Sequence, residues 1–126
     1  MERPLQQNAD VEADETASLI ASDKVEGTSV YNHSGEKLGS VHNVMINKIS
    51  GQVSYVVVSF GGFLGIGSEY NAVPWKKLTF NSTMGGYEID VPPERLQGAP
   101  RYAAGEEPWV DPLYGRSVDD YYGLTP

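Results

Sequence analysis

Two histidines, His33 and His42, are the side chains of this chain that could serve as general bases or metal ligands near neutral pH. Neither has a carboxylate at a spacing that would build a metal site locally. We expect His33 to belong to a polar turn and His42 to be a partly exposed strand residue. The chain has no cysteine, which excludes a disulfide, a thiolate zinc site and a cysteine nucleophile.

A glycine-rich segment, residues 61–67, followed by Ser68 nearly matches the phosphate-binding loop of nucleotide hydrolases. That loop needs a lysine after its second conserved glycine and then a helix, whereas Ser68 and Glu69 stand here and a strand is expected. The glycines are therefore interpreted as a tight β connection, whose apolar side chains cover an apolar surface.

Two pairs of acidic residues, Glu106-Glu107 and Asp119-Asp120, could suggest acid–base chemistry. Adjacent side chains point apart in an extended chain, so we expect solvated charge instead. The Gly-x-Ser-x-Gly turn that activates a serine nucleophile is missing from the sequence. The sequence therefore predicts a protein that is not an enzyme, with no catalytic residue, no cofactor and no metal.

The acidity of this 126-residue chain, whose net charge is −8, lies in its flanks. Residues 1–18 hold five acids against one base (−4), residues 19–97 seven against six (−1), and residues 98–126 five against two (−3). Because no basic stripe could neutralise phosphates, neither nucleic acid nor an anionic membrane is an expected partner.

The polar, acidic residues 1–18 lack the basic start and apolar stretch of a secretory signal, so we expect a cytoplasmic protein. No window is apolar enough for a membrane span, so a membrane could be reached only through a partner. With no aromatic residue, this segment is expected to be a disordered tail, with a short helix as the alternative.

From Leu19 onward, apolar residues recur at every second position between turn signals, which is typical of a small barrel or sandwich. A phase shift near His42-Asn43 predicts a bulge. Pro74 should lie at a strand end or edge. The expected strands cover residues 25–31, 37–49, 52–60, 69–73, 78–80 and 87–91, followed by one helical turn over residues 92–96.

The predicted fold class is therefore all-β, a small barrel of five to six strands over residues 19–97 with one short helical turn and irregular tails. Residues 98–126 form an acidic tail that is unusually rich in aromatic side chains. Because a disordered tail is normally poor in aromatics, we expect parts of residues 100–123 to lie against the barrel or a neighbouring subunit.

An ordered series of motifs over residues 19–100 resembles the PRC-barrel domain. These motifs are Leu19-Ile20-Ala21-Ser22-Asp23, residues 35–41, residues 51–58, residues 61–67, and Val73-Pro74-Trp75 with Leu78. The family includes the cytoplasmic domain of the photosynthetic reaction-centre H subunit and the C-terminal domain of a ribosome maturation factor. The resemblance implies a small β-barrel that serves as an assembly or docking module without general catalytic activity. The chain looks like a free-standing bacterial member, so neither named role transfers directly.

A small barrel buries a modest share of its surface, and exposed apolar loops on such domains often mark contacts. Plugging of a barrel end is the alternative for the apolar loop residues. The candidate interaction residues are Val56, Val58, Phe63, Leu64, Ile66, Trp75, Trp109, Tyr114, Tyr121 and Tyr122.

The favoured hypothesis is a non-enzymatic protein-binding module that self-associates as a homodimer and has a further partner of unknown identity. One alternative is a barrel that holds a small ligand or ion among tyrosines and tryptophans. Another, which rests on the resemblance alone, is an accessory factor for ribosome assembly.

Overall fold

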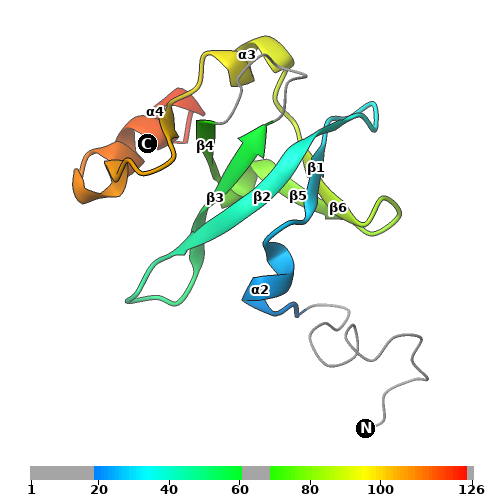
Figure 1. The fold of residues 1–126 in the computed structure, drawn as a ribbon, viewed down its shortest axis with the longest axis horizontal. Helices are drawn as coiled ribbons and strands as arrows, with labels where there is room; N and C mark the ends of the chain where they lie inside the picture. The colour runs from blue at the N-terminus through cyan, green and yellow to red at the C-terminus, as the bar shows by residue number, and fades with distance from the viewer. Residues whose placement is uncertain (1–18, 61–68, 125–126) are drawn as a thin grey trace, which may run out of the picture.

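The computed structural model describes residues 19–60 and 69–124, which fold around one curled β-sheet (Figure 1). Seven strands pair in the order β5-β6-β1-β2-β3-β4-β7. The strands are β1 (Ser29–Tyr31), β2 (Lys37–Ile46), β3 (Val53–Phe60), β4 (Glu69–Pro74), β5 (Leu78–Asn81), β6 (Gly86–Ile89) and β7 (Arg101–Ala103). The helices are α2 (Ser22–Val25), α3 (Pro93–Gln97) and α4 (Tyr114–Tyr121), with 3₁₀ turns η2 (Trp75–Lys77) and η3 (Pro108–Val110). The all-β prediction is confirmed.

The sheet wraps around an apolar core. Val56 and Phe60 of β3 lie in the same buried cluster as Tyr87 and Ile89 of β6, although β1 and β2 separate those strands in the sheet. Such contacts require the sheet to curl back on itself. In the described part of the chain, β5 and β7 form its two ends, so the sheet is barrel-like but not closed.

The predicted bulge in β2 is confirmed. Val41 pairs with Val58 and Asn43 with Val57, so His42 is the extra residue between two consecutive pairs. The bulge keeps Val41 in the core while His42 is exposed on β2, as expected.

The strand expected over residues 25–31 is wrong in its first half. Ser22–Val25 form a helical turn, and the Thr28 hydroxyl donates a hydrogen bond of 2.9 Å to the carbonyl oxygen of Lys24. Gly27 follows at a φ of +87°, which ends the turn. Local side-chain bonding therefore competes successfully with strand formation at this point.

The second strand also ends earlier than expected, at Ile46 instead of residue 49. Asn47 Oδ1 accepts hydrogen bonds from the backbone N–H groups of Ile49 and Ser50, both at 2.9 Å. An asparagine that satisfies the backbone of the next residues builds a turn instead of a strand.

The other expected elements are confirmed in type and place. β3 lies between β2 and β4, and its Val56, Val57 and Val58 are fully buried. Pro74 is the last residue of β4, where its missing N–H breaks no ladder. α3 begins at Pro93.

The C-terminal segment, defined here as residues 98–124, is more regular than expected. β7 pairs with the edge of β4 and brings the number of strands in the described residues to seven. Tyr114, Val118 and Tyr122 recur every four residues, so they share one face of the α4 region, and Val118 and Tyr122 are buried there. They form a second apolar cluster with Ala72 and with Tyr55. The segment thus lies against the chain's own sheet, beside β3 and β4 in Figure 1.

Candidate functional site

A continuous row of aromatic rings joins the sheet to the C-terminal segment. Successive ring centroids lie 4.2, 5.6, 6.2, 4.9 and 5.1 Å apart. Most of these contacts are tilted or edge-to-face, the arrangements that aromatic pairs favour beyond simple burial. In order, the members of this aromatic row are His42, Tyr70, Tyr102, Tyr114, Trp109 and Tyr55.

Tyr55 anchors helix α4 to the sheet. Its hydroxyl lies 3.0 Å from the carbonyl oxygen of Gly115 and 3.0 Å from Oδ2 of Asp119. Burial, followed by the hydrogen bond to the Asp119 carboxylate, raises the pKa of Tyr55 to about 12. At neutral pH the phenol is thus a neutral donor, which suits a structural contact and not a nucleophile.

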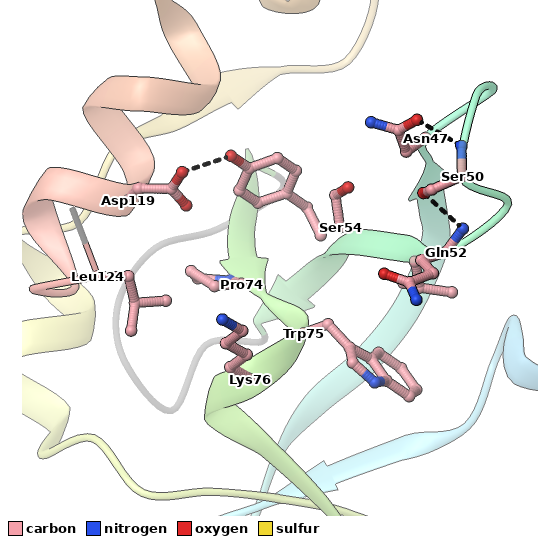
Figure 2. Close-up of a pocket in the computed structure, with 11 residues that line it drawn as sticks. Asn47, Ser50, Gln52, Ser54, Pro74, Trp75, Lys76, Asp119 and Leu124 are labelled. Carbon is pink, nitrogen blue, oxygen red and sulfur yellow. Dashed lines mark hydrogen bonds between the residues drawn. The ribbon is translucent and has the colours of Figure 1, made fainter. Parts of the chain in front are cut away.

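An open groove of about 680 Å³ lies beside Tyr55 (Figure 2). Asp119 and Leu124 of the C-terminal segment stand on one side, the hairpin between β2 and β3 on the other, and Pro74 and Lys76 lie between them. The lining residues are Asn47, Ser50, Gln52, Val53, Ser54, Tyr55, Pro74, Trp75, Lys76, Asp119 and Leu124.

Several exposed apolar side chains lie near Trp109 in the structure or in the chain. Ile46 and Trp109 line a small hollow of about 160 Å³ together with Met45. Ile46 is 50% exposed, Val110 77% and Leu113 66%. Ile46, Trp109, Val110 and Leu113 are named the end patch below. Exposed apolar residues that cluster in this way are typical of contact surfaces.

His33 lies between two carboxylates that the sequence did not associate with it. Its Nε2 is 2.8 Å from Oδ1 of Asp90, and its Nδ1 is hydrogen-bonded to Oε2 of Glu88. These bonds, to Asp90 first and Glu88 second, raise the pKa of His33 above its ordinary value. The parallel pairing of β1 with β6, which sets Tyr31 opposite Glu88, brings these residues together. Within the described ranges, no group of three or more His, Asp or Glu side chains could hold a metal ion.

The expected interaction residues are found in several different places. Val56 and Val58 are fully buried in the core, so in this fold they cannot form a contact surface. β3 is apolar on both faces because the sheet curls over one face and the C-terminal segment covers the other. Phe63, Leu64 and Ile66 lie outside the described residues.

The aromatic candidates do not form one surface. Trp75 is 37% exposed, lines the groove and contacts the ring of Tyr87. Trp109 and Tyr114 are half-buried members of the aromatic row, and Tyr122 is buried. Tyr121, also half-buried, contacts Arg95. Sequence reasoning missed the groove and three residues of the end patch, Ile46, Val110 and Leu113. The groove and the end patch both depend on where the C-terminal segment docks.

A family model of the PRC-barrel domain matches residues 18–96, which is more than half of the chain. The chain belongs to the PRC-barrel domain family. No curated protein matches it. The PRC-barrel match ends before the C-terminal segment, so β7 and α4 lie outside the matched residues, and both pack on the sheet. Within the described residues, no helix is both long and apolar enough to cross a membrane.

Proposed function

We propose that this protein is a non-enzymatic assembly module that self-associates through the end patch. Domains of the PRC-barrel type serve in protein interaction and assembly, and are generally without catalysis. The observation that carries the proposal is the exposure of Ile46, Val110 and Leu113 around the half-buried Trp109.

Burial of these side chains against a second copy would be favourable. Apolar surface removed from water contributes about 25 cal/mol per Å². A standard interface buries roughly 800 Å² on each partner, which is more than the end patch alone supplies. Ile49, at the turn of the neighbouring hairpin and 95% exposed, extends the apolar surface on the side of Ile46.

The charge of the chain opposes this association. Two copies that each carry −8 repel one another, and salt screens that repulsion over a Debye length of about 10 Å at 0.1 M. Self-association should therefore strengthen as ionic strength rises, because apolar contact is retained while repulsion is weakened. An interface held by ion pairs would respond in the opposite way.

Light scattering and sedimentation velocity over a range of protein concentrations test the proposal. The native chain should show twice the mass of one copy, while Val110→Asp and Ile46→Asp should be monomeric. Leu19→Asp is the matched control, since Leu19 is 71% exposed but lies outside the end patch. A native chain that stays monomeric at the highest concentration would exclude self-association, and thermal melts would confirm that the variants fold.

A further inference from the structure

The floor of the groove contains a piece of strand that lacks a neighbour. β4 ends at Pro74, which pairs with Tyr55, whereas β3 begins two residues earlier, at Val53. The chain then turns away in η2. Within the described ranges, Val53 and Ser54 therefore have no strand on the β4 side, although both line the groove.

Ser54 is unpaired on its other side as well. Ile46 pairs with Val53 and Met45 with Tyr55, so Ser54 is an extra residue in β3 opposite β2. Backbone N–H and C=O groups need partners, and those at a free strand edge are a template for another extended chain. The groove side of Val53 and Ser54, where no described strand pairs, is such an edge.

The side chains around this edge provide both charge and apolar contact. Lys76 makes no ion pair with any residue of 19–60 or 69–124, and it lines the same groove as Asp119. Pro74 and Leu124 supply apolar surface in the same lining. In an acidic chain, this pairing of opposite charges fits a segment that carries both an acidic and a basic side chain.

We propose that the groove binds an extended peptide segment of a partner protein, which adds as a short strand along Val53 and Ser54. In this mode of recognition, main-chain hydrogen bonds supply affinity and the side-chain contacts supply specificity. An acidic side chain of the peptide contacts Lys76, a basic one contacts Asp119, and an apolar one covers Pro74 and Leu124. This inference does not depend on self-association, because the free edge is present in a single copy.

A random-peptide library displayed on phage is the probe, panned against the immobilised full chain. Retained peptides, made synthetically, are titrated into ¹⁵N-labelled protein. We expect the largest shifts at the amides of residues 52–54 and at the indole N–H of Trp75. Shifts confined to the end patch, or a library that yields no binder, would overturn the proposal.

Charge reversal supplies the second readout. Lys76→Glu should weaken binding of the retained peptides about tenfold, whereas Lys77→Glu, the same change one residue further on and outside the groove lining, should not. Equal affinities in the two variants would argue against the groove. Chito-oligosaccharides are the counter-probe, because Trp75 among amides also suits a sugar ring. If they shift the same amides and the peptides do not, the assignment to a peptide is wrong.

Discussion

Arg95 and Tyr121 bind each other reciprocally. The guanidinium carbon lies 4.1 Å from the centre of the Tyr121 ring, and Nη2 donates a hydrogen bond to the Tyr121 carbonyl oxygen. In return, the Tyr121 hydroxyl donates to the carbonyl oxygen of Arg95 at 2.7 Å. Arg95 belongs to α3, near the end of the PRC-barrel match, and Tyr121 ends α4. The pair therefore ties the C-terminal segment to the matched domain.

Replacement of Arg95 by alanine should loosen this connection. A cation–π contact at an exposed site contributes about 0.5–1 kcal/mol and a hydrogen bond about 1 kcal/mol. We expect Arg95→Ala to lower the free energy of unfolding by about 1–2 kcal/mol, measured by urea denaturation. Arg116→Ala, which changes an exposed arginine within α4, is the control and should have little effect. Equal losses in both variants would contradict the prediction.

Gly115 packs closely on Tyr55, and a substitution at Gly115 tests whether this contact affects stability. A Cβ at position 115 would lie 2.9 Å from the Tyr55 hydroxyl oxygen, so Gly115→Ala must displace that hydroxyl. In an exposed helix this substitution normally stabilises by about 1 kcal/mol. Here we expect destabilisation in the native background but stabilisation in a Tyr55→Phe background, where the hydroxyl is gone. A double-mutant cycle measures the difference, and additive effects would show that the contact does not matter.

His33 should make stability depend on pH. Both ring nitrogens contact carboxylate oxygens, so only the doubly protonated ring donates both bonds. Folding raises the pKa of His33 above 6.5. The contribution of His33 to stability is therefore complete below pH 6.5 and is lost as the pH rises through the pKa of the folded state. The stability difference between the native chain and His33→Gln should therefore shrink from pH 6 to pH 9 in urea titrations. His42→Gln is the control, since that ring stacks on Tyr70. A difference independent of pH would refute this assignment.

Tyrosine ionisation reports on the contacts of the C-terminal segment. The pKa values of Tyr55 and Tyr114 are raised to about 12, in each case chiefly by burial. Because folding raises these pKa values, the two neutral hydroxyl groups contribute to stability below the ordinary pKa of 10. This contribution is lost as the pH rises towards 12. An ultraviolet titration should show that Tyr55→Phe removes a late-ionising group, not one near pH 10. Loss of an early-ionising group would place Tyr55 in solvent.

The core of the fold was predictable because the alternation of apolar residues is local. The expected strands match the observed ones within a few residues from β2 to β6, and the bulge at His42 follows from a phase shift in the sequence itself. The error at residues 25–28 arose because a Thr28 side-chain bond closes a turn that alternation does not detect.

The candidate sites were less predictable because they depend on contacts between distant residues. His33 meets Glu88 and Asp90 only through the pairing of β1 with β6. The aromatic content of the C-terminal segment indicates that it packs against another surface, but does not indicate that it forms β7 and α4. Its spacing of Tyr114, Val118 and Tyr122 is a helical signal, which differs from the strand alternation of residues 19–97.

The pairing of β7 with β4 has a consequence for how the chain is made. Synthesis proceeds from the N-terminus, so β4 is complete before β7 and α4 exist, and its edge stays open during that interval. An open strand edge is a template for pairing with another nascent chain. The C-terminal segment thus protects the edge of β4, and a chain that lacks this segment would be prone to aggregate before it could be degraded.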